Sequence, residues 1–216
     1  MSTAVVDRHR GVGTPAAASR RVGPAPTLAD RDDARLLAAL RAQDPAVADP
    51  LWRRFAPMVF RLLRRVLGPW APIEDAVHVV LLCAFHGGRR LRPHADLTRF
   101  VVRTIARIAQ AELRSRTSGW SPSAWRAFGA GRVTARETAE REAVQRFYRI
   151  LDRLGAVDRI AFVFHYVEGL DAREVAAAIG RSPAQTDRCL RRSLATVVQA
   201  IDGDPVLRPM RRASPS

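Results

Sequence analysis

Residues 171–192 read DAREVAAAIGRSPAQTDRCLRR, which predicts two short helices separated by a tight turn. Asp171 and Glu174 have the spacing of a capping box at the start of a helix. Gly180 can adopt the left-handed conformation with which helices often end. The first helix is therefore expected to be barely two turns long, and a second helix is expected to begin directly after it.

The second helix is expected to run from Pro183 to about Val198, preceded by a further capping box from Ser182 and Gln185. Two short helices joined by a turn that holds a glycine form a helix-turn-helix, whose second helix can enter the major groove of DNA. The positions expected to face inward are Thr186, Leu190, Leu194 and Val197. The side chains expected to reach phosphates or base edges are Arg181, Ser182, Gln185, Arg188, Arg191 and Arg192. The other interpretation is a helical hairpin with a solvated polar face.

The charge of the chain also favours a polyanionic partner. There are 36 basic and 21 acidic residues in a chain of 216, a net charge of +15, and every basic residue is an arginine. A GC-rich genome explains arginine in place of lysine, but it does not explain the excess of bases over acids. Nucleic acid is therefore a more natural partner than an anionic membrane surface.

Several classes of protein are disfavoured by what the sequence lacks. The sequence contains no uninterrupted stretch of about eighteen apolar residues, so a membrane-spanning helix is not expected. Cys83 and Cys189 have no histidine or cysteine at a metal-ligand spacing, so we expect buried free thiols, no metal and no cofactor. The five histidines are scattered singly and no catalytic motif accompanies them, so an enzyme is not expected. These features together predict a cytoplasmic protein.

Helical periodicity covers almost the whole chain after residue 31 and predicts an all-α fold of two small helical domains joined by a flexible linker. Between residues 117 and 135 the periodicity fails and Gly, Ser and Pro are frequent. The expected organisation is a disordered N-terminal tail at 1–30, a helical domain at 31–116, the linker at 117–135, a helix-turn-helix domain at 136–203, and a disordered basic tail at 204–216.

The helix expected from Asp96 to Arg116 carries an unusual row of like charges. Arg99, Arg103 and Arg107 recur at four-residue steps on the side opposite its apolar residues. Such pairs repel by a few tenths of a kcal/mol each, which is easier to understand if an anion lies along that face. The alternative is a solvated face in an arginine-rich proteome.

The segment 162–193, reading FVFHYVEGLDAREVAAAIGRSPAQTDRCLRRS, resembles region four of bacterial RNA polymerase sigma factors. The likeness is to the small two-domain extracytoplasmic-function group in particular. The positions that fit the family pattern are Tyr166, Glu168, Gly169, Glu174, Val175, Ala176, Gly180, Ser182 and Arg192. Region four of that family binds the minus-thirty-five promoter element.

The upstream domain is similar to region two of the same family. Residues 39–44 resemble the beginning of region two. Residues 74–78 resemble the helix of region two that binds the polymerase core, with His78 where the family usually has Gln. The segment 100–114 is similar to the helix that engages and melts the minus-ten element. It departs from the family at Val101, Ile108 and Glu112, where tryptophan, asparagine and aspartate are usual.

The resemblance implies a sigma factor that directs promoter-specific transcription initiation, with promoter DNA and the RNA polymerase core as partners. The resemblance also allows an anti-sigma protein as a further partner. It implies that Glu74, Asp75 and His78 face the core, and that Arg99, Arg103, Arg107 and Arg114 hold the minus-ten element. The alternative is a stand-alone helix-turn-helix transcription regulator whose N-terminal helices have diverged to another interaction. The departures at His78, Val101 and Ile108 favour it.

Overall fold

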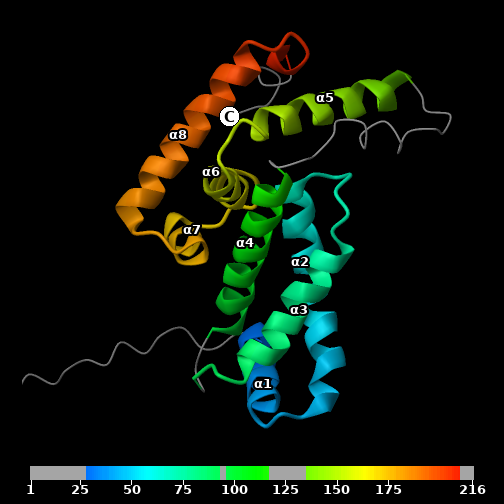
Figure 1. The fold of residues 1–216 in the computed structure, drawn as a ribbon, viewed down its shortest axis with the longest axis vertical. Coiled ribbons are helices and arrows are strands. Elements are labelled where there is room, and N and C mark those ends of the chain that lie inside the picture. Colours follow the sequence, from blue (N-terminus) through cyan, green and yellow to red (C-terminus); the bar gives the residue numbers. More distant parts are fainter. Residues whose placement is uncertain (1–27, 93–95, 117–134, 210–216) are drawn as a thin grey trace, which may run out of the picture.

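The structure of the protein, a computed structural model, describes residues 28–92, 96–116 and 135–209 (Figure 1). Every regular element in these ranges is a helix, so the predicted all-α class is confirmed. The elements are α1 (Leu28–Arg41), η1 (Pro45–Val47), α2 (Ala48–Leu67), α3 (Glu74–Gly88), α4 (Leu97–Arg116), α5 (Ala135–Leu151), α6 (Ala156–Phe162), the π-helical turn η3 (Val163–Val167), α7 (Ala172–Ile179) and α8 (Pro183–Asp202). Residues 1–27 of the expected N-terminal tail and residues 117–134 of the expected linker lie outside the described residues, whereas residues 28–30 belong to α1.

The first four helices form one group around the apolar side of α2. Leu51, Phe55, Val59 and Leu63 recur at intervals of four residues in α2 and are almost fully buried. This spacing places them on one face of a helix, where α3 and α4 cover them. The helix ends at Gly68, which has a φ of 109° that side chains other than glycine rarely adopt.

The second group contains α5 to α8. Both predicted ends of α7 and the predicted start of α8 are confirmed, whereas α8 continues to Asp202 instead of ending at about Val198. The Asp171 carboxylate accepts hydrogen bonds from the backbone of Arg173 and Glu174 at 2.8 and 2.7 Å. Gly180 closes α7 in the left-handed conformation, with φ 67°. Both expected capping boxes are present, before α7 and before α8.

The apolar side of α8 differs from the prediction at one position. Thr186, Leu190 and Val197 are buried as expected, but Leu194 is exposed and Ser193 is buried in its place. Successive four-residue steps rotate by about 40° more than a full turn, so a row extended in fours drifts away from the buried face.

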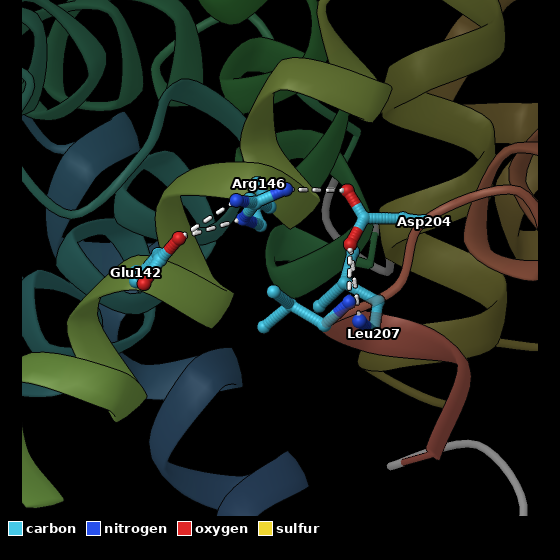
Figure 2. A network of polar contacts seen from close by, with 5 residues as sticks. Glu142, Arg146, Asp204 and Leu207 are labelled. Atoms are coloured by element: carbon cyan, nitrogen blue, oxygen red, sulfur yellow. Dashed lines mark hydrogen bonds and ion pairs between the residues drawn. The ribbon is translucent and has the colours of Figure 1, made fainter.

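The chain expected to be disordered from Asp204 is ordered as far as Pro209. One Asp204 oxygen accepts hydrogen bonds from the backbone of Val206 and Leu207, and the other accepts from Arg146 of α5 at 3.2 Å (Figure 2). Leu207 is consequently buried against the second group. A polar anchor therefore fixes the chain directly after α8.

The two groups are not separate bodies in this structure. α4 lies between them and packs on α2 and α3 on one side and on α6 and α7 on the other (Figure 1). The buried side chains of both groups form one continuous cluster, from Leu36 in α1 to Leu207 after α8. The first group thus meets the second through α4 and the end of α2.

Candidate nucleic-acid and polymerase interfaces

The outer side of α8 presents the side chains predicted to contact DNA. Arg181, Ser182, Gln185 and Arg188 are all exposed at the N-terminal end of the helix. Ser182 and Gln185 also cap it, because the Ser182 hydroxyl accepts from the Gln185 backbone at 3.3 Å and the Gln185 side-chain oxygen accepts from the Ser182 backbone at 3.1 Å. The side-chain nitrogen of Gln185 takes no part in this cap, so it can still donate to a base or phosphate.

The two arginines in the middle of α8 pair with carboxylates of the protein itself. Arg191 pairs with Asp187 one turn earlier in the same helix. Arg192 donates to both oxygens of Asp158 in α6, at 2.7 to 3.0 Å, and this hydrogen bonding raises the pKa of Arg192. Arg181 and Arg188, by contrast, make no ion pair or hydrogen bond within the described ranges. They are the cations of this set that are available to an external anion.

Asp158 is a residue that the sequence prediction missed. It lies in the first turn of α6 and its side chain is only 17% exposed. It accepts from Arg192 and from the thiol of Cys189, so it fixes α8 on α6. Burial, together with the bond to Asp158, raises the pKa of the Cys189 thiol to about 12. A local pattern gives no signal for such a residue, because its partners lie about thirty positions away in the chain.

Two arginines of the α4 row, Arg103 and Arg107, border the second group. Arg99, Arg103, Arg107 and Arg114 are exposed, and Arg99 pairs with Asp96 at 3.6 Å. Arg103 and Arg107 border a cleft of about 430 Å³, whose other side is formed by Val157 and Ile160 of α6 and by Ala178, Ile179 and Gly180 at the end of α7. We call this space the α4–α7 cleft. Neither of its two arginines makes an ion pair within the described ranges, so the cleft is positively charged.

The three departures from the family pattern in α4 have different environments. Val101 is fully buried in the core of the first group. Ile108 is half-buried and packs against the same cluster, and Glu112 is partly exposed. Val101 and Ile108 therefore contribute to packing in this arrangement of the helices.

The residues predicted to face the polymerase lie together on α3. Glu74 and Asp75 are exposed in its first turn, where the helix dipole favours negative charge. His78 is exposed one turn later, and its Nδ1 lies 2.8 Å from the Glu74 carbonyl oxygen. The Glu74 carboxylate is 3.8 Å from Arg64 of α2.

An apolar patch adjoins these residues, and the sequence analysis did not identify it. Val79 and Leu82 of α3 are exposed, Leu82 by 57%, and Trp52 of α2 is partly exposed beside the His78 ring at 5.4 Å between centroids. We call Trp52, His78, Val79 and Leu82 the α3 patch. The sequence did contain a signal for this patch, because the residues of α3 are apolar on all sides of the helix. Such a helix is expected to be covered on every side. The first group covers only one of those sides.

Among the described residues, no cluster of His, Cys, Asp or Glu could hold a metal ion, and no helix is long and apolar enough to cross a membrane. The expectation of two buried thiols is wrong for Cys83, which is exposed on α3, while Cys189 is buried. Arginine, amide and apolar side chains on helices thus make up the candidate surfaces. Such groups bind polyanions and protein surfaces.

Residues 51–119 match the family model of sigma-70 region 2, a range that contains α2, α3 and α4. About a third of this chain is thus similar to region 2 of the sigma-70 family of RNA polymerase sigma factors, which supports a sigma factor. Its role is in transcription initiation, and region 2 belongs to initiation factors that are not enzymes. No curated protein matches the chain. The matched range includes both the arginine row of α4 and the α3 patch.

Proposed function

We propose that this protein is a small sigma factor of the extracytoplasmic-function type, which binds the polymerase core through α3, the minus-ten element through α4 and the minus-thirty-five element through α8. The observation that carries the proposal is the region 2 match, because it covers the two helices to which the core and minus-ten contacts are assigned. The capped, arginine-bearing α8 supports the third contact.

Core binding is assigned to the α3 patch together with Glu74 and Asp75. The patch is apolar at its centre and acidic at the N-terminal end of α3. Protein interfaces combine a buried apolar centre with a polar rim, and a partly exposed tryptophan is a frequent anchor. We expect Leu82 and Trp52 to supply most of the affinity for the core.

Promoter contact is assigned to two sets of side chains. Arg103 and Arg107, with Arg99 and Arg114, would hold the minus-ten element, and Arg181, Ser182, Gln185, Arg188, Arg191 and Arg192 would face the minus-thirty-five duplex. Arg188 can contact a guanine with two hydrogen bonds, and Gln185 suits an adenine. Arg191 and Arg192 would first have to leave Asp187 and Asp158, so their contacts are expected to contribute less than that of Arg188.

In vitro transcription with purified polymerase core, with and without the protein, tests the proposal on a genomic promoter library. Mapping the 5′ ends of transcripts should reveal starts that depend on the protein and share paired upstream elements. No dependent starts, together with no co-elution with the core, would rule the proposal out.

Variants separate the contact with the core from the contact with the minus-ten element. Leu82→Glu should abolish co-elution with the core, whereas Leu194→Glu, at a similarly apolar exposed position on α8, should not. Arg103→Glu combined with Arg107→Glu should remove transcription starts while core binding persists. Arg141→Glu combined with Arg149→Glu, at exposed positions of α5, makes the same charge change away from both DNA-contacting sets and should leave starts unchanged.

A second candidate function is that of a stand-alone helix-turn-helix regulator. It is favoured by the α4–α7 cleft, where Arg103 and Arg107 lie across from Gly180, just before α8. The two arginine sets could therefore lie along one duplex. This function requires tight sequence-specific DNA binding by the protein alone, which an electrophoretic shift assay without polymerase measures.

A further inference from the structure

The α4–α7 cleft has the size and the lining of a site for a small molecule. Its volume is about 430 Å³. Pockets that hold small organic ligands have volumes of roughly 300–1,000 Å³. One wall of the cleft comes from α4, and the other comes from α6 and the end of α7. A DNA duplex cannot enter a space of this size, whereas a single nucleotide can.

Three polar side chains of α4 line the cleft without a partner. Arg103 and Arg107 are exposed and Gln110 is partly buried. None of these three side chains makes a hydrogen bond or an ion pair within the described ranges. Arg99, in the same row, pairs with Asp96 and does not line the cleft. The Gln110 amide has two N–H donors and an acceptor oxygen, all of which are available to a ligand.

The charge of the cleft favours an anion with two charged centres. Arg103 and Arg107 are four residues apart in a helix, which places their Cβ atoms about 5–6 Å apart on one face. None of the described residues that line the cleft is acidic, so these two positive charges have no counter-ion there. Guanidinium groups match phosphate oxygens with paired hydrogen bonds. A diphosphate can therefore place one phosphate on each arginine.

The rest of the lining is apolar and suits the organic part of such a ligand. Val157 and Ile160 of α6 border the cleft together with Ala178 and Ile179 of α7, and Phe100 borders it from α4. An inorganic diphosphate would leave these side chains in contact with water, whereas a planar base would cover them. Apolar walls with a few convergent polar groups are typical of sites for small organic molecules.

We propose that the α4–α7 cleft binds a nucleoside diphosphate, with its phosphates on Arg103 and Arg107, its base against the apolar walls and a hydrogen bond to Gln110. The bound diphosphate neutralises two arginines that are assigned to the minus-ten element. The ligand and that element therefore compete, and promoter binding weakens as the ligand concentration rises. The competition rests on the proposed function, whereas binding of the ligand to the cleft does not.

Isothermal titration calorimetry of the full chain with ADP and with GDP tests the site. At least one of the two should bind, and both adenosine and inorganic pyrophosphate should bind about tenfold more weakly or less, because each lacks part of the contacts. Arg107→Gln should weaken nucleotide binding about tenfold or more, as expected for losing hydrogen bonds between charged groups. Arg99→Gln removes the same charge from the same helix outside the cleft and should leave the affinity for the nucleotide unchanged.

Gln110→Ala separates the site from a general attraction of anions to a basic protein. It leaves the net charge unchanged and should weaken binding about fivefold, as expected for losing one neutral hydrogen bond. No binding of either nucleotide, or equal weakening by Arg99→Gln and Arg107→Gln, would overturn the site. Pyrophosphate that binds as tightly as the nucleotides would overturn the assignment of a nucleoside. If Arg107→Gln does not fold by circular dichroism, Arg103→Gln replaces it with the same expected loss.

Promoter binding by the reconstituted holoenzyme measures the competition. An electrophoretic shift assay without nucleoside triphosphates would use a promoter identified by the transcript mapping. The nucleotide that binds, at about ten times its own Kd, should raise the apparent Kd for the promoter by up to about tenfold. An unchanged apparent Kd would refute the competition. The calorimetry needs no polymerase, so an absence of dependent transcription starts would refute the proposed function and leave the nucleotide site standing.

Discussion

At the residue scale, the candidate DNA-contacting surface is shaped by acidic partners that local sequence patterns do not reveal. The capping boxes at Asp171 and Ser182 could be predicted, because each depends on residues three positions apart. The pairing of Arg192 with Asp158 could not, since it depends on how α8 packs on α6. An arginine that looks free in a helical projection is therefore partly neutralised in the fold.

The two cysteines should differ sharply in reactivity. Alkylation proceeds through the thiolate, and at about pH 8 a thiol with a pKa of about 12 holds almost none. Iodoacetamide should therefore modify Cys83, which is exposed, and leave Cys189 unmodified until the protein unfolds. Peptide mass spectrometry after timed labelling checks this, and comparable rates at both positions in the native protein would contradict it.

At the element scale, helix ends determine where the elements of the second group begin and end. We expect Asp171→Ala to lower the free energy of unfolding by about 1 kcal/mol, because two backbone N–H groups of α7 lose their acceptor. Asp187→Ala removes only an exposed ion pair within α8 and should cost less than about 0.5 kcal/mol. Urea unfolding of both variants provides the comparison.

The anchor after α8 should make stability depend on pH. Burial alone would raise the pKa of Asp204, but hydrogen bonds from Val206, Leu207 and Arg146 lower it on balance. A carboxylate with a lowered pKa stabilises the fold above its ordinary pKa, and this contribution is lost as the pH falls through the folded-state value. The Tm difference between wild type and Asp204→Asn should therefore shrink from neutral pH to about pH 3. A difference independent of pH would exclude this role.

At the scale of the whole molecule, the sequence predicted the fold class and most helices, but not how the two groups meet. Each helix is encoded locally by its apolar spacing and its ends, as in α2 and α7. The contact between groups depends on Tyr148, Arg159 and Glu168 reaching a helix more than eighty residues earlier. No local periodicity encodes such pairs, and the Gly- and Ser-rich segment between the groups suggested independent domains.

The continuous core predicts that both groups unfold together. Calorimetry of the wild type should give one transition, because buried side chains run from α1 through α4 to the chain after α8. Arg159→Ala leaves the Val66 carbonyl without its donor, and we expect it to lower stability by about 1–3 kcal/mol or more and to broaden or split the transition. A wild type that already unfolds in two steps would contradict this coupling.

The inward-facing arginines of α4 also bear on how free copies distribute in a cell. A protein with a net charge of +15 binds any DNA sequence weakly, and a chromosome offers an enormous excess of such sites. With Arg103 and Arg107 turned toward α7, fewer phosphates can be neutralised at once, so each random encounter with the chromosome is shorter. This arrangement would then leave a larger diffusing pool of the protein, whereas a variant with both arginines turned away from α7 would be titrated onto bulk DNA.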